Sequence, residues 1–170
     1  MNRVLRALIL SAFVGVAVGA TPLVDGKIEK GEYASSKSVL DGASTLYYSS
    51  DGSGGLFVAL ETKTLGWAGI GLGSRRMDGA RIYMGFVKDQ TPVFSEQLGS
   101  GHRHNPVKDK TADKSIVAQN GSQNVLEFHL PADKLPFKGK AVNYIAAFAA
   151  ASDLSSYHED NFDSGTFTLP

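Results

Sequence analysis

Two polar loops of this chain each carry a side chain that could bind a metal. Residues 74–80 hold Met77 among charged neighbours, and residues 152–160 hold His158. A thioether is a soft ligand suited to haem iron, and pairing it with an imidazole raises the reduction potential of that iron. Taken alone, each residue is better explained as an ordinary loop side chain. The surroundings of the two residues therefore decide the interpretation.

Both loops follow segments with unusually small side chains. Gly69, Gly71 and Gly73 precede the methionine loop, and an alanine-rich stretch, residues 146–151, precedes the histidine loop. Glycine at alternate positions weakens a strand and usually permits a close approach of backbone or ligand. A flat macrocycle could lie on such a surface. The alternative is that Trp67 and the glycines only serve the packing of a neighbouring strand or ring.

Neighbouring basic side chains offer further contacts. Arg75 and Arg76 precede Met77 and could pair with haem propionates, because a guanidinium matches a carboxylate with two parallel hydrogen bonds; solvated loop charges are the alternative. His102 and His104 form a His-x-His pair, a spacing that on a strand would place both rings on one face to hold a metal ion. A clear third ligand is missing from the sequence around this pair.

The rest of the chain predicts the strands that position these loops. Short segments rich in aromatic and β-branched residues recur between Gly, Asp, Asn, Ser and Pro, which is typical of a sandwich or barrel. Residues 99–123 are expected to form a long loop with a short edge strand, and residues 132–135 one helical turn. The strands are predicted at residues 46–49, 55–62, 66–72, 81–88, 92–96, 124–130, 142–151 and 166–169.

Alternation along the strands predicts which side chains face the core. The residues expected to point inward are Ile82, Met84, Phe86, Leu126, Phe128 and Leu130. By the same parity, Glu127 and His129 are expected to face outward, with His129 as a solvated strand residue. Residues 55–62 are apolar at both parities, which predicts a central strand covered on both faces.

The first twenty residues differ in character from the rest. Arg3 and Arg6 precede an apolar run, and the small residues that end at Ala20 offer a cleavage point, which is the pattern of a secretory signal peptide. The run is about 12 residues long, whereas a spanning helix needs roughly 20. We therefore predict a signal peptide at residues 1–20, a single domain at 21–170 without a membrane span, and a periplasmic or secreted location.

Composition excludes several classes of function. The chain has no cysteine, so it can form no disulfide and no Cys-x-x-Cys-His site for covalent haem. Without Arg3 and Arg6, the 17 basic residues fall to 15 against 17 acidic residues, a formal net charge of −2. Nothing here resembles the basic patch used for nucleic-acid binding. Without a Gly-x-Ser-x-Gly elbow or a His-Glu-x-x-His helix, we expect a protein that is not an enzyme.

Several blocks of the sequence together resemble a DOMON domain. The resemblance covers most of residues 21–170 and implies an all-β fold, an immunoglobulin-like antiparallel β-sandwich. In the family's cytochrome members one methionine and one histidine hold haem b without a covalent bond, and the matching positions here are Met77 and His158. The blocks are Asp25-Gly26-Lys27-Ile28, Gly31-Glu32-Tyr33, Leu46-Tyr47-Tyr48, Gly66-Trp67-Ala68-Gly69-Ile70-Gly71, Met77-Asp78-Gly79-Ala80-Arg81 and the stretch from Ala147-Phe148 to His158.

The resemblance implies electron transfer, because two protein ligands would leave the iron no open site for a substrate. The haem would contact Trp67, Gly71, Arg75 and Arg76. The redox partner would be an unidentified protein of the cell envelope, since the sequence contains no dehydrogenase, hydroxylase or transmembrane cytochrome. Three alternatives remain: a cofactor-free structural or interaction protein, a metal-binding protein that uses His102 and His104, and a module binding sugar or another small ligand. In the last of these, the rings stacking on sugar faces would come from Trp67, Tyr47, Tyr48 or Tyr83.

Overall fold

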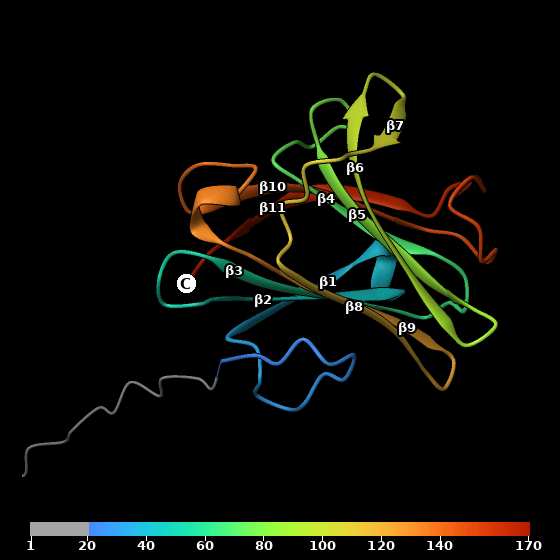
Figure 1. Cartoon of the computed structure of the whole chain (residues 1–170), viewed down its shortest axis with the longest axis horizontal. Helices are drawn as coiled ribbons and strands as arrows, with labels where there is room; N and C mark the ends of the chain where they lie inside the picture. The colour runs from blue at the N-terminus through green and yellow to red at the C-terminus, as the bar shows by residue number, and fades with distance from the viewer. Residues whose placement is uncertain (1–20) are drawn as a thin grey trace, which may run out of the picture.

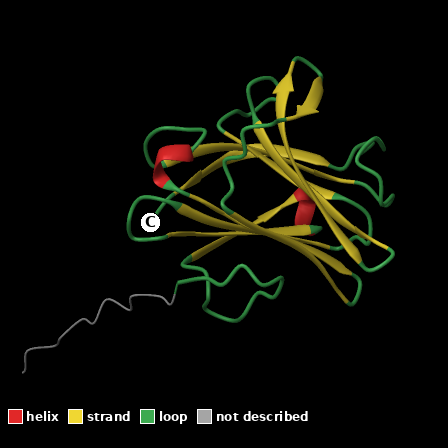
Figure 2. Ribbon diagram, viewed as in Figure 1, coloured by secondary structure: helices red, strands yellow, loops and turns green. Residues whose placement is uncertain are grey.

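The computed structural model describes residues 21–170, and the predicted signal peptide at residues 1–20 lies outside this range. Within it, eleven strands form two antiparallel sheets packed face to face (Figures 1 and 2). The predicted all-β sandwich is therefore confirmed. The only helical elements among residues 21–170 are two short 3-10 turns, Leu40–Gly42 and Ala132–Lys134. No helix in this range is long enough to cross a membrane.

The two sheets draw their strands from both halves of the chain. The five-stranded sheet has the order β1-β2-β3-β9-β8, and the six-stranded sheet has the order β11-β10-β4-β5-β6-β7. The first sheet consists of β1 (Ser35–Val39), β2 (Ser44–Ser50), β3 (Leu56–Thr62), β8 (Lys114–Asn120) and β9 (Gln123–Leu130). The second consists of β4 (Ala68–Leu72), β5 (Arg81–Lys88), β6 (Thr91–Ser100), β7 (Arg103–Pro106), β10 (Ala141–Phe148) and β11 (Phe162–Thr168).

The main core lies between the sheets, and it corrects the predicted inward face of β5. Tyr83 of β5 is fully buried there, with its ring stacked on that of Phe128 of β9 at 4.2 Å between centroids. Ile82, Met84 and Phe86 instead form a second cluster on the opposite face of β5. The prediction was wrong because β5 is apolar on both faces, and alternation alone does not say which face meets the other sheet. Leu126, Phe128 and Leu130 do lie in the main core.

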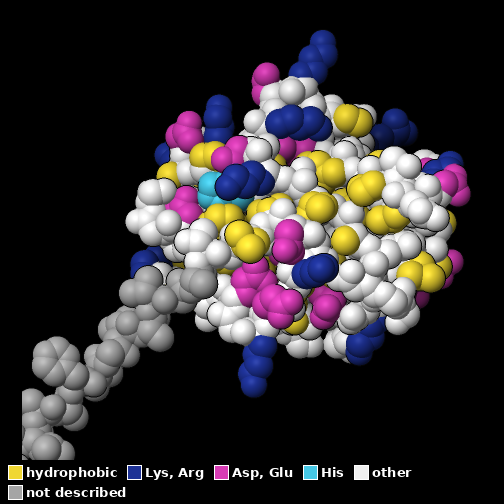
Figure 3. Space-filling model, turned by 60° about the horizontal axis from the view of Figure 1, so that its bottom comes forward, with side chains coloured by type: hydrophobic (Ala, Val, Ile, Leu, Met, Phe, Trp, Pro, Cys, Tyr) yellow, Lys and Arg dark blue, Asp and Glu magenta, His cyan; other side chains and the backbone are white. Residues whose placement is uncertain are grey.

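The outer face of the five-stranded sheet is covered by the segment that precedes β1, drawn in blue below that sheet in Figure 1. Val24, Ile28 and Tyr33 pack on Phe57 and Ala59 of β3, which confirms that this strand is covered on both faces. Figure 3 is turned toward this side, and Lys and Arg side chains are spread singly over the face it shows. This face therefore has no basic patch of the kind that nucleic-acid binding uses.

Glu127 and His129 were expected to face outward, with His129 solvated, but neither side chain is exposed to solvent. Both side chains do point away from the main core, but Glu127 is fully buried and His129 is only 9% exposed. The Tyr33 hydroxyl donates to Glu127 at 2.8 Å and the Gly26 amide at 2.6 Å, while burial raises the pKa of the carboxyl. His129 contacts two carboxylates instead, Asp113 through Nδ1 at 2.7 Å and Asp51 through Nε2 at 3.1 Å.

The residues expected to form a long loop, 99–123, contain strands as well. β8 is the expected edge strand, but β6 extends to Ser100 and turns back into β7, making a hairpin that projects above the sheets in Figure 1. At the other end of the six-stranded sheet, β10 stops at Phe148, earlier than predicted, and β11 starts at Phe162. The hairpin and the connection between β10 and β11 form part of the site described next.

Candidate functional site

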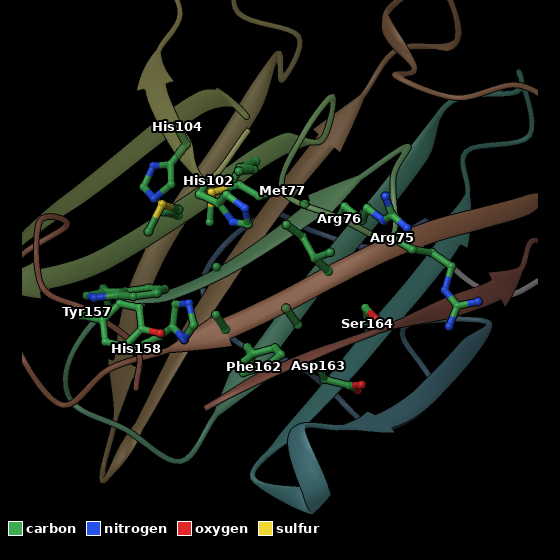
Figure 4. Close-up of a pocket in the computed structure, with 18 residues that line it drawn as sticks. Arg75, Arg76, Met77, His102, His104, Tyr157, His158, Phe162, Asp163 and Ser164 are labelled. Carbon is green, nitrogen blue, oxygen red and sulfur yellow. The ribbon is translucent and has the colours of Figure 1, made fainter. Parts of the chain in front are cut away.

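A cavity of about 550 Å³ lies on the face of the six-stranded sheet that points away from the main core. This volume lies within the range of small-molecule and cofactor sites. Six of its lining residues are those predicted from the sequence to contact haem: Trp67, Gly71, Arg75, Arg76, Met77 and His158. His102 and His104, the residues of the alternative metal site, line the same cavity (Figure 4).

The floor of the cavity is formed where β4 pairs with β10. Gly69 is the cross-strand partner of Ala147, and Gly71 is the partner of Ile145. A Cβ atom added to Gly71 would lie 2.6 Å from Cγ1 of Ile145, so this glycine also makes room for its neighbour. The contact supports the packing interpretation of the glycines, and both Gly69 and Gly71 also line the cavity.

The Met77 loop is fixed to the β6–β7 hairpin by several contacts. The amide of Gly79 donates to the carbonyl of Gly99 at 3.1 Å, and the amide of Gly99 donates to Ala80 at 3.0 Å. Asp78 accepts a hydrogen bond from the amide of Gly101 at 2.8 Å. A Cβ atom on Gly99 would lie only 1.7 Å from the Met77 carbonyl oxygen, so the two segments touch directly. The hairpin therefore sets the position of the partly buried Met77.

On the other side of the cavity, the His158 ring is held in a defined tautomer. Its Nδ1 lies 2.8 Å from the carbonyl oxygen of Glu159. Because a carbonyl can only accept, Nδ1 must carry the proton, and in the neutral ring Nε2 keeps a free lone pair. The rings of Tyr157 and Phe162 flank the imidazole, with centroids 4.6 and 5.4 Å away. These contacts restrain the orientation of the ring.

Trp67 ties the histidine loop to the sheet. Its indole Nε1 donates to Ser156, at 2.8 Å to the hydroxyl and 3.2 Å to the carbonyl oxygen. The backbone of Trp67 also pairs with Ala149 and Ala151, on the stretch that leads from β10 into the loop. The indole is 4% exposed and packs beside Met84 in the second cluster. Trp67 therefore positions the His158 loop as well as lining the cavity.

The charged groups at the cavity differ in their partners. Arg75 and Arg76 are exposed, and neither forms an ion pair with any residue from 21 to 170. His102 is exposed, whereas His104 is partly buried with Nδ1 hydrogen-bonded to Gln97. Burial lowers the pKa of His104, and the nearby His158 lowers it further. Over the same range, no three His, Asp or Glu side chains are arranged to hold a metal ion, so the His-x-His pair still lacks a third ligand.

The aromatic residues proposed for sugar stacking are not available together. Tyr48 and Tyr83 are buried in the main core, and Trp67 is almost fully covered. Tyr47 lies on the other sheet and lines a different hollow together with Tyr33. The aromatic side chains that are exposed at the main cavity, Tyr157 and Phe162, were not singled out from the sequence. Tyr157 directly precedes His158 and Phe162 follows it by four residues, and this proximity in the chain was the signal that could have indicated them.

Comparison with known proteins agrees with this architecture. No family model and no curated protein sequence matches the chain. One solved structure with a similar fold is the cytochrome b domain of pyranose dehydrogenase from Coprinopsis cinerea, with a TM-score of 0.60 and 16% identity over 79% of this chain and 80% of that one. Another is the cytochrome domain of cellobiose dehydrogenase from Myriococcum thermophilum, with a TM-score of 0.52 and 14% identity over 75% of each chain.

At sequence identities of 16% and 14%, the similarity to these two structures is a similarity of fold. Both structures are DOMON-type haem b domains, the family indicated by the sequence blocks around Trp67 and Met77. The resemblance is therefore confirmed at the level of the fold, and this chain has the fold of a DOMON-type cytochrome b domain.

Proposed function

We propose that this protein is an exported electron-transfer module that binds haem b in the cavity of the six-stranded sheet, with Met77 and His158 as the two axial ligands of the iron. The observation that carries the proposal is the placement of these two side chains, from loops far apart in the chain, at one apolar cavity. The structural neighbours that are cytochrome b domains support the same cofactor.

The side chains that line the cavity are chemically suited to hold haem. His158 presents a free Nε2 because its Nδ1 is engaged by Glu159, which is the arrangement usual for histidines that bind metals. Met77 supplies a soft thioether, and a Met/His pair favours the reduced iron. The floor of Gly69, Gly71 and Ala147 leaves room for a flat ring. Haem held here would supply one-electron chemistry at its iron.

The remaining residues orient the cofactor and restrict access of water. Arg75 and Arg76 have no ion-pair partner among residues 21–170, so their guanidinium groups are free to bind the two propionates. Ile82, Met84 and Ile145 give the cavity an apolar wall. Two protein ligands leave no site for substrate, so we expect electron transfer to a partner protein of the cell envelope and no catalysis.

Titration of hemin into the purified apoprotein tests the proposal. We expect one equivalent to bind with the absorption spectrum of a six-coordinate low-spin haem. The variant His158→Ala should weaken binding at least about tenfold, since it removes a direct ligand. His102→Ala is the matched control, because His102 lines the same cavity but is exposed, and it should bind like the wild type. Equal binding by the wild type and His158→Ala would refute the assignment of this ligand.

A further inference from the structure

A second imidazole at the cavity, that of His104, is held by a hydrogen bond at Nδ1, as the ring of His158 is. His104 of β7 is partly buried, and its Nδ1 is hydrogen-bonded to Oε1 of Gln97. In this arrangement Oε1 of Gln97 faces the imidazole, and Nε2 of Gln97 donates to the Ser95 hydroxyl at 3.0 Å. An amide oxygen only accepts, so Nδ1 of His104 carries the proton and Nε2 keeps the free lone pair.

The hydrogen bond at Nδ1 distinguishes His104 from His102. A histidine that binds a metal almost always donates its other ring N–H to a protein acceptor, which fixes both tautomer and orientation. The ring of His104 has such an acceptor in Gln97, as that of His158 has in Glu159. The ring of His102 makes no hydrogen bond to any residue in the described range 21–170. Two of the three cavity histidines are therefore oriented as ligands.

The strand register places His104 beside Met77. His104 is the cross-strand partner of Gly99, and partners in an antiparallel pair project their side chains to the same face. On that face of Gly99, a Cβ atom would lie 1.7 Å from the Met77 carbonyl oxygen and 3.3 Å from its Cγ. Figure 4 shows His104 and Met77 together on one side of the cavity and His158 across from them. His104 and Met77 therefore approach the same side of a bound ring.

We propose that His104 is an alternative axial ligand for the position opposite His158, where its imidazole competes with the thioether of Met77. This inference rests on the proposed function, since it requires haem in the cavity. The pocket would then offer iron two ligand pairs, Met/His and His/His, the second of which favours the oxidised state more strongly.

The test uses the full protein loaded with hemin and the variant Met77→Leu, which nearly conserves side-chain volume. We expect its ferric haem to stay six-coordinate and low-spin, with the electron paramagnetic resonance signature of two imidazole ligands. The double variant Met77→Leu/His104→Ala should become high-spin, and added imidazole should restore its low-spin spectrum. The control Met77→Leu/His102→Ala should match Met77→Leu alone.

The outcomes separate the two proposals. A high-spin Met77→Leu protein, unchanged by the further substitution of His104, would overturn the role of His104 while leaving haem binding intact. Wild-type protein that is folded by circular dichroism and binds no hemin would overturn the proposed function, and this inference with it. A low-spin Met77→Leu protein that loses this spectrum only with His104→Ala would establish the second ligand.

Discussion

The contact between Gly99 and Met77 makes Gly99→Ala the most informative single substitution in this protein. The new Cβ atom would lie 1.7 Å from the carbonyl oxygen of Met77 and 2.7 Å from its carbonyl carbon. Both neighbouring atoms belong to the backbone, so no flexible side chain can rotate away. Ordinary contact begins near 3.5 Å, so the two segments must separate by roughly 2 Å.

A shift of this size has two consequences that can be worked out. Overpacking at a tight contact costs about 1 to 3 kcal/mol. For a domain of this length each kcal/mol lowers Tm by roughly 2 to 4 °C, so we expect a decrease of about 2 to 12 °C. The shift also weakens the two hydrogen bonds that join Gly79 and Ala80 to Gly99. Because these bonds hold the Met77 loop, the thioether should leave the iron.

The assay combines thermal unfolding with spectroscopy of the hemin-loaded protein. Gly99→Ala should lose the thioether-to-iron charge-transfer band and show a lower reduction potential. The matched control is Gly85→Ala on β5, whose added Cβ would lie 2.3 Å from the Val117 side chain, in the main core and away from Met77. It should lose stability but keep the thioether band. Retention of the band in Gly99→Ala, or its loss in both variants, would refute the role of the hairpin in placing Met77.

Two further predictions concern other parts of the structure. Trp67→Phe keeps a ring but removes both hydrogen bonds to Ser156, each worth about 0.5 to 1.5 kcal/mol; amide exchange in residues 152–160 should speed up and hemin affinity should fall, and unchanged exchange would contradict the role of the indole. Burial would raise the pKa of Glu96, but hydrogen bonds from Thr111 and Arg81 outweigh it and hold this pKa below its usual value of 4.5. Its ionised form therefore stabilises the fold above that pH, and the contribution is lost as the pH falls through the lower folded value. Urea unfolding from about pH 6 to pH 3 should show a stability difference between wild type and Glu96→Gln that shrinks toward acid; a constant difference would contradict this assignment.

Much of the strand pattern could be predicted because it depends on local alternation. The bounds of β5 agree with the prediction, and β3 and β9 differ from it by one residue at one end. β1 and β7 were missed because they are short, polar strands that depend on pairing with neighbours, and β7 places His104 at the cavity. This pairing with neighbouring strands is a tertiary contact that local composition does not reveal.

The site was only partly predictable, for a related reason. The types of Met77 and His158 and the small residues near them indicated a flat ligand, and the fold brings both loops to one cavity. The covered faces could not be predicted, because the segment before β1 returns to bury Glu127 from about a hundred residues away in the chain. Tyr83 and Met84 could be assigned to opposite faces of β5 but not to the correct ones, because both faces of this strand are apolar.

The most direct test of the central claim is the visible absorption spectrum of the protein, expressed with export to the periplasm of haem-sufficient cells, before and after reduction with dithionite. We expect sharp reduced bands of a six-coordinate low-spin haem b bound at one equivalent. Folded protein with no haem absorbance, even after incubation with hemin, would contradict the proposal that this protein binds haem.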